Sequence, residues 1–150
     1  MTKSIDKLSL QLKPLFEREP IEIAYLYGSV MAGENDKLSD YDFGILFSER
    51  LSQKMRFELR LQLFGELGKK IGVYEENIDV VDLEKVPVLL QFNVISGRTI
   101  FCRNDDKRVE FETYVMSRYH DQHYYLDRYI DETIRKIEKG VYFDRQISYT

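Results

Sequence analysis

The stretch LYGSVMAGENDKLSDYDFGIL, residues 26–46, constrains the fold most, because it joins two segments that each predict a β-strand. The first segment, IEIAYLYG (21–28), alternates along its length and is rich in β-branched and aromatic residues. The second segment, DYDFGILF (40–47), is an apolar run that begins with two aspartates. The polar residues GENDKLS (33–39) predict a loop between them. Two carboxylates therefore stand at the start of a core strand, which is costly unless they bind something.

Predicted helices and strands alternate along the rest of the chain. The sequence predicts helices over 4–18, 52–72 and 86–96, a short helix that begins at Ser29, and strands over 77–83 and 97–103. From residue 105 to residue 139 there is no proline or glycine, which predicts one long helix, or two in tandem, ending at Gly140. One face of this helix carries Val109, Met116, Tyr119, His123, Leu126, Ile130, Ile134 and Ile137. This alternation indicates an α/β or α+β domain with a small, mostly covered sheet.

Composition narrows the class of protein. The length of 150 residues favours a single domain over 1–150, and 43% hydrophobic residues suffice for a core. A net charge of −4 argues against direct binding to nucleic acid. Cys102 is the one cysteine, so no intrachain disulfide forms, and a cytoplasmic location fits best. Charges throughout the N-terminal segment predict neither a signal peptide nor a membrane span there.

The aspartates have the pattern of a metal site. Asp40 and Asp42 are two residues apart, so in a strand they point the same way and repel unless a cation lies between them. Mg²⁺ prefers such oxygen ligands, and three carboxylates can hold two metal ions. On the strand 77–83, Asp79 and Asp82 point to opposite faces and cannot both join the pair. Asp79 is preferred, because it would lie on the side of Asp40 if the two strands ran in opposite senses.

The Gly-Ser pair predicts a phosphate site beside the aspartates. Gly28 lets the backbone come close to a ligand. The hydroxyl of Ser29 and the amides at a helix N-terminus donate hydrogen bonds to phosphate. An isolated Asp-x-Asp is usually a solvated charge or a helix cap, but its combination with Gly-Ser and a later aspartate indicates a nucleoside triphosphate site.

These motifs carry a family resemblance. The stretch GSVMAGENDKLSDYDFGIL resembles the G-S-x10-D-x-D signature of the polymerase-β-like nucleotidyltransferase superfamily, and in particular its minimal branch, the MNT antitoxins that are paired with HEPN toxins. NIDVVDLEKVPVLLQFNVISGRTIFCRND and YVMSRYHDQHYYLDRYI resemble later parts of that branch, so the match covers about residues 20–140. The resemblance implies a nucleotidyltransferase fold, with a mixed sheet flanked by helices. It also implies an antitoxin that transfers AMP from Mg²⁺–ATP to a tyrosine hydroxyl of a cognate HEPN ribonuclease toxin.

The resemblance assigns the site roles as follows: Gly28 and Ser29 hold the triphosphate, Asp40 and Asp42 bind two Mg²⁺ ions, and Asp79 binds one ion and assists deprotonation of the acceptor. Many relatives have an arginine where this chain has Ala32. If that arginine neutralises phosphate, turnover is lower here or another basic group replaces it. Arg50, Lys54, Arg56 and Arg60 predict a solvated helix face, with the steering of ATP or of an RNA-bound partner as the alternative.

A second motif, RYHDQHYY, has the R-x4-H-x-Y spacing of HEPN ribonucleases, which are all-helical domains. On a helix Arg118 and His123 are about 140° apart, so a core or interface histidine is the better interpretation. His120 is expected at the surface. The neighbouring tyrosines, 119, 124, 125 and 129, either pack their rings or form an interaction surface.

Two other functions stay open. The chain is short for a nucleotidyltransferase core plus an acceptor domain, so we expect the acceptor on another protein. One alternative is an antitoxin that neutralises the toxin by binding alone, and the other is a nucleotidyltransferase that acts on a small molecule. The sequence also leaves open a homo-oligomer or a hetero-oligomer with the toxin.

Overall fold

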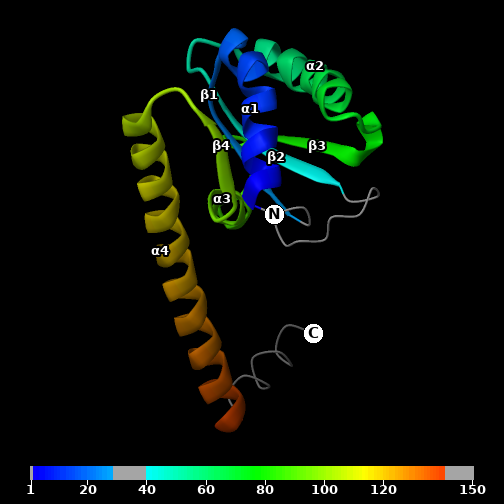
Figure 1. Cartoon of the computed structure of the whole chain (residues 1–150). Helices are drawn as coiled ribbons and strands as arrows, with labels where there is room; N and C mark the ends of the chain where they lie inside the picture. The colour runs from blue at the N-terminus through cyan, green and yellow to red at the C-terminus, as the bar shows by residue number, and fades with distance from the viewer. Residues whose placement is uncertain (1, 29–39, 141–150) are drawn as a thin grey trace. The chain divides into compact units, whose positions relative to one another are not determined.

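The structure is a computed structural model that describes residues 2–28 and 40–140 (Figure 1). The chain divides into two compact units, Met1–Val115 and Met116–Thr150, which are described one at a time. The predicted single domain over 1–150 stays a prediction. The expected helix start at Ser29 and the expected loop over 33–39 lie outside the described residues.

The predicted helices and strands are confirmed to within a few residues. In chain order they are α1 (Thr2–Arg18), β1 (Ile21–Tyr27), β2 (Tyr41–Phe47), α2 (Gln53–Ile71), β3 (Ile78–Asp82), α3 (Val88–Ile95), β4 (Arg98–Cys102) and α4 (Asp105–Glu138). A short 3-10 turn, η1 (Glu75–Asn77), precedes β3 and was not predicted. The segment from residue 105 forms one continuous helix rather than two, as the absence of proline and glycine allows.

The four strands form one mixed sheet in the order β3-β2-β1-β4, which confirms the predicted fold class. β1 is antiparallel to both β2 and β4, whereas β2 and β3 are parallel. Asp79 was preferred on the assumption that the strands of Asp40 and Asp79 run in opposite directions, and this assumption is therefore wrong. In a parallel pair the starts of both strands lie at the same end of the sheet, so Asp42 lies opposite Asp79 by register.

Helices cover both faces of the sheet (Figure 1). α1 and α2 contribute Leu12, Phe16 and Leu63 to the larger core cluster, where they meet Phe43 and other strand residues. On the other face the smaller cluster holds Val94 of α3 together with Ile23, Tyr25, Leu46 and Leu83. A Cβ at Gly44 would lie 2.3 Å from Val94 Cγ1, so glycine is required where α3 crosses β2. The carboxylates thus stand at one end of a sheet that is rigid on both sides.

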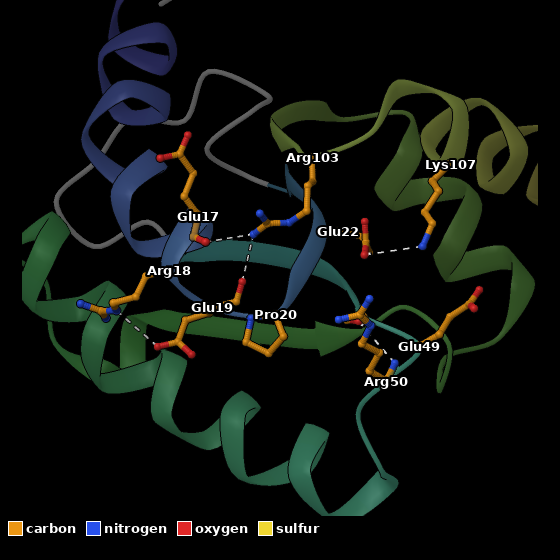
Figure 2. A pocket seen from close by; sticks show the side chains of 10 residues that line it. Glu17, Arg18, Glu19, Pro20, Glu22, Glu49, Arg50, Arg103 and Lys107 are labelled. Atoms are coloured by element: carbon orange, nitrogen blue, oxygen red, sulfur yellow. Dashed lines mark hydrogen bonds and ion pairs between the residues drawn. The ribbon is translucent and has the colours of Figure 1, made fainter.

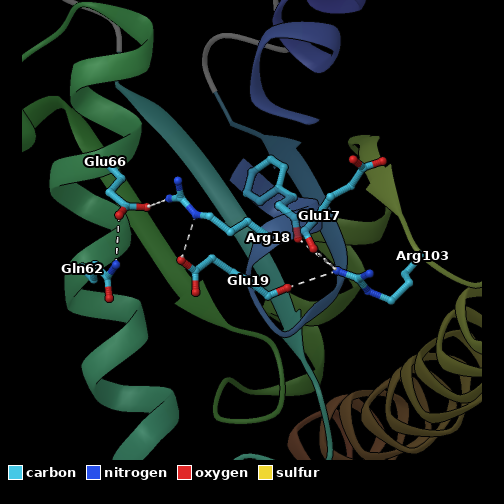
Figure 3. Close-up of polar contacts among 7 residues, drawn as sticks. Glu17, Arg18, Glu19, Gln62, Glu66 and Arg103 are labelled. Atoms are coloured by element: carbon cyan, nitrogen blue, oxygen red, sulfur yellow. Dashed lines mark hydrogen bonds and ion pairs between the residues drawn. The ribbon is translucent and has the colours of Figure 1, made fainter. Parts of the chain in front are cut away.

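Arg103 ties the end of α1 to the sheet (Figure 3). Its side chain donates hydrogen bonds of 3.0–3.1 Å to the backbone carbonyls of Phe16, Glu17, Glu19 and Ile21. These include carbonyls that a helix end leaves without a partner in the helix. Arg18 forms ion pairs with Glu19 at 3.4 Å and Glu66 at 3.0 Å, which links α1 to α2.

In the second unit, α4 continues from Met116, and none of its described residues, 116–140, is buried. The His123 side chain is 57% exposed, so its interpretation as a core histidine is wrong and the interface interpretation remains. His120 is exposed, as predicted. Tyr124, Tyr125 and Tyr129 are 57%, 68% and 65% exposed, so their rings are not packed in a core. Among the described helices, none has the length and apolar character needed to cross a membrane.

Candidate active site

The sheet register brings two of the predicted site residues, Asp42 and Asp79, together with Tyr27. Asp42 pairs with Tyr27 of β1 on one side and with Asp79 of β3 on the other. Paired residues on neighbouring strands point to the same face, so these three side chains share one face, away from α1 and α2. Asp40 lies two residues before Asp42 and is exposed, and Asp79 is exposed as well, whereas Asp42 is half-buried. The cluster therefore has one shielded carboxylate and two that are open to solvent.

The carboxylates influence one another electrostatically. Burial, followed by the charges of Asp79 and Asp40, raises the pKa of the Asp42 carboxyl above its ordinary value. Two like charges that cannot separate favour either a proton or a bound cation between them. The three aspartates thus have the mutual influence that the sequence pattern predicted.

Gly28 makes the closest backbone approach to this cluster. Its φ of +83° lies in the left-handed region that favours glycine. A Cβ at this position would lie 2.1 Å from Asp42 Oδ2, so the Asp42 carboxylate would have to move away to accommodate it. Gly28 therefore allows the end of β1 to lie against the Asp42 carboxylate. Ser29, the other half of the predicted phosphate site, and Ala32 lie outside the described residues.

Tyr27 belongs to the site but was missed from the sequence. Burial, then the charges of Asp42 and Asp79, raises its pKa to about 12. The phenol is therefore neutral and protonated across the physiological pH range. The available signal was its position, since it directly precedes Gly28 on a strand that was expected to end at the site.

Asp82 is a structural residue on the opposite face. Its Oδ2 lies 3.8 Å from Arg56 Nε, and its Oδ1 accepts a hydrogen bond from the Glu84 backbone N–H at 3.0 Å. The prediction that Asp79 and Asp82 point to opposite faces is thus supported by their surroundings. The sequence predicted that the basic residues after β2 form a solvated helix face, and this prediction is wrong for two of them. The Arg56 side chain is only 12% exposed, and Arg60 donates a hydrogen bond to the Val80 carbonyl. These arginines hold α2 against β3.

The donor chemistry of the aspartate cluster fits a hard divalent cation. Carboxylate oxygens are the ligands that Mg²⁺ prefers, and burial, followed by the charges of Asp79 and Asp40, raises the pKa of Asp42. As the side chains stand, no three His, Cys, Asp or Glu residues within 2–28 and 40–140 are grouped closely enough to hold a metal ion. Metal binding at Asp40, Asp42 and Asp79 stays a prediction.

A separate pocket of about 530 Å³ lies at the other end of the sheet, where β1 begins and β2 ends (Figure 2). Its side chains are matched in charge, and they include Lys107, which forms an ion pair with Glu22 at 3.6 Å. Arg103, which also lines the pocket, is occupied by backbone carbonyls. None of the predicted site residues lines this pocket.

Solved structures share this fold. A chain of a toxin–antitoxin crystal structure with AMP-PNP has a TM-score of 0.62 and 21% identity, over 84% of this chain and 98% of that chain. A chain of the MntA-HepT toxin-antitoxin structure has a TM-score of 0.57 and 18% identity, over 89% and 99%. A chain from a tri-AMPylated Shewanella oneidensis HEPN toxin in complex with MNT antitoxin has a TM-score of 0.56 and 20% identity, over 89% and 99%. At these identities the likeness concerns the fold.

The family follows from the sequence itself. No curated protein matches the chain. The family model described as polymerase beta, nucleotidyltransferase, matches residues 11–106, a range that includes every predicted site residue. The resemblance to the polymerase-β-like superfamily is therefore confirmed, and the chain belongs to the polymerase β nucleotidyltransferase family.

Proposed function

We propose that the protein is an antitoxin that transfers AMP from Mg²⁺–ATP to a tyrosine hydroxyl of a cognate HEPN ribonuclease toxin. The observation that carries the proposal is the register of Asp42 opposite Asp79, with Gly28 against the Asp42 carboxylate, in a chain of the nucleotidyltransferase family. Two similar structures support the nucleotide and the acceptor, since one contains AMP-PNP and the other contains a tri-AMPylated HEPN toxin.

The proposed roles combine the family resemblance with the geometry of the described aspartates. Asp40, Asp42 and Asp79 would hold Mg²⁺, which neutralises triphosphate charge and stabilises the departing pyrophosphate when it is bound. Gly28 leaves room for the triphosphate beside the strand end, and Ser29 donates a hydrogen bond to it. Tyr27 remains protonated, so it adds no further negative charge to the site.

The transfer itself breaks one bond to phosphorus and forms another. The tyrosine oxygen of the acceptor attacks the α-phosphorus, a new O–P bond forms, and the bond from the α-phosphorus to the bridging oxygen breaks. Pyrophosphate leaves with that electron pair, and the phenolic proton passes to the carboxylate of Asp79. Asp79 is exposed, unlike Asp42, so an incoming hydroxyl can reach it. Positioning of the two reactants supplies a large part of the rate.

The test incubates the purified chain with α-labelled ATP, Mg²⁺ and the product of the adjacent reading frame. We expect label on a tyrosine of that product, and we expect the label to disappear with Asp42→Asn. Asp106→Asn, an exposed aspartate in the first turn of α4, is the matched control and should label normally.

Two outcomes would contradict the proposal. If Asp42→Asn neutralises the toxin fully, and neither this variant nor the unsubstituted chain transfers AMP, the chain acts by binding alone. If label appears on a small molecule and on no protein, the acceptor is not a toxin.

A further inference from the structure

The second unit presents a long apolar surface on α4. Six residues, which we call the α4 stripe, are exposed: Met116, His123, Leu126, Ile130, Ile134 and Ile137. Their exposed fractions run from 41% for Met116 to 57% for the His123 side chain. A lone helix gains little stability from its own hydrogen bonds in water, and most helices are stabilised by packing of an apolar face. This part of α4 therefore has an apolar face, but within the described residues that face remains exposed.

The spacing of the α4 stripe indicates what packs there. Met116, His123, Ile130 and Ile137 recur every seven residues, and Leu126 lies three residues after His123. A seven-residue repeat keeps one seam of a helix facing a neighbouring helix. From Met116 to Ile137 the stripe is about 32 Å long at 1.5 Å per residue, which is about the diameter of a small domain. The partner segment that packs on the α4 stripe is thus helical, and its length is about the diameter of a small domain.

The width of the apolar surface indicates whether a single helix or a bundle of helices packs against it. Tyr129 and Tyr125 extend the surface on one side of the stripe, so from Met116 to Tyr125 it spans about half of the helix circumference at 100° per residue. A pair of coiled helices needs only the narrow seam, whereas a helix added to a bundle needs the wider face. His123, stacked on Tyr119 with centroids 5.8 Å apart, is also a poor core residue for two identical helices.

We infer that the α4 stripe is the surface by which this protein docks on a helical bundle of its partner toxin. The identity of the partner rests on the proposed function, in which the toxin is an all-helical HEPN domain. The exposed tyrosines and Met116 have the composition of a protein interface. His123 Nε2 lies 3.4 Å from Asp127 Oδ2, so the stripe carries a polar group near its middle.

The experiment measures binding of the full chain to the purified product of the adjacent reading frame by calorimetry. Ile130→Asp and Leu126→Asp place a charge in the stripe, and each should weaken binding by about 30-fold or more. Arg128→Asp is the matched control, because Arg128 lies on the opposite side of the helix and contacts only the Tyr124 ring and hydroxyl among the contacts of the described residues. It should bind within about threefold of the unsubstituted chain. Circular dichroism checks that each variant keeps its helix content.

The outcomes separate this inference from the proposed function. If both stripe variants bind as the unsubstituted chain does, the inference fails, whether or not AMP is transferred. If the unsubstituted chain binds and transfers nothing, while Ile130→Asp no longer binds, the proposed activity fails and the docking surface stands. If light scattering shows a dimer of the unsubstituted chain that Ile130→Asp converts to a monomer, the occupant is a second copy and the inference is overturned. Failure of the unsubstituted chain to bind the product overturns it as well.

Discussion

Asp42 and Asp79 lie directly opposite each other on two parallel strands, at the end of the sheet where both strands begin. This relationship depends on the parallel connection through α2, because an antiparallel connection would move the start of β3 to the far end of the sheet. The half-buried carboxylate and the exposed carboxylate then share one face, where Gly28 closes against the first of them.

Asp42→Asn should stabilise the protein in the absence of divalent cations. Because the pKa of Asp42 is raised, the folded state favours the protonated carboxyl, and this contribution to stability is lost as pH rises from the unfolded pKa of about 3.9 through the folded pKa. At pH 7 the neutral amide removes the repulsion, so we expect a Tm about 1–3 °C higher without metal. Adding Mg²⁺ should raise the Tm of the unsubstituted chain and leave the variant unchanged. If the metal-free variant has a lower Tm than the metal-free unsubstituted chain, the repulsion between Asp42 and the neighbouring carboxylates is contradicted.

Gly28→Ala should cost more stability than Gly72→Ala. Both glycines have a positive φ, +83° and +86°, so alanine strains the backbone equally at each position. At Gly72 the new Cβ meets nothing within 4 Å, whereas at Gly28 it meets the Asp42 carboxylate at 2.1 Å. We expect about 1–2 kcal/mol of destabilisation at Gly72 and at least about 2 kcal/mol more at Gly28 in urea unfolding. Equal losses would mean that the carboxylate moves away without cost.

Asp79→Asn and Asp82→Asn should separate activity from stability on a single strand. Asp79 is exposed, so its replacement should leave the free energy of unfolding within about 0.5 kcal/mol while it removes nucleotide transfer. Asp82 is buried beside Arg56, so its replacement should cost about 1–3 kcal/mol and spare Mg²⁺ binding. Urea unfolding and a titration with Mg²⁺ measure the two effects. Loss of Mg²⁺ binding in Asp82→Asn alone would reverse the assignment.

Tyr27→Phe should remove part of the loss of stability at high pH. The pKa of Tyr27 is raised from 10.0 to about 12, so between these values the phenol ionises in the unfolded state before it does so in the folded state. The unsubstituted chain therefore loses stability across this window, and the phenylalanine variant should lose less. Urea unfolding at two pH values, one below and one inside the window, measures the difference. Tyr74→Phe, at a residue that is 77% exposed, is the control.

Arg103→Met should destabilise the protein by about 2–4 kcal/mol. The substitution removes the donors that satisfy the carbonyls of Phe16, Glu17, Glu19 and Ile21. Arg50→Met removes a positive charge from an exposed residue of the same pocket and should change stability by less than about 0.5 kcal/mol. Thermal or urea unfolding of both variants checks the prediction. A similar small effect in both would show that water replaces Arg103 at the helix end.

Local patterns explain which parts of the fold could be predicted. The alternation in IEIAYLYG and the uninterrupted run from residue 105 each specify their own element, so β1 and α4 were predicted from the sequence. The direction of β3 relative to β2 depends on packing between distant residues, and no local pattern encodes it. The same holds for Arg56 and Arg60, whose spacing is typical of a solvated helix face but whose side chains reach β3.

The site residues likewise divide into those whose position a local pattern predicts and those whose position depends on tertiary packing. The spacing of Asp40 and Asp42 predicted that their carboxylates share a face, because residues on one strand share a face at intervals of two. The register places Asp79 opposite Asp42, although the strand direction assumed when Asp79 was chosen was wrong. Tyr27 was missed because an aromatic residue on a strand usually packs in the core. The roles of Ser29 and Ala32 stay predictions.

Arg60 has a consequence for how the sheet meets other molecules. β3 is an edge strand, and an edge strand offers open backbone groups to which a strand from another chain can pair. Arg60 Nε already donates to the Val80 carbonyl, one residue after Asp79, so the guanidinium occupies the place where such a strand would bond. The described sheet ends at β3, and Arg60 covers one backbone oxygen of that edge. The same arginine therefore disfavours pairing of another strand at this point of the edge, on the strand that also carries Asp79.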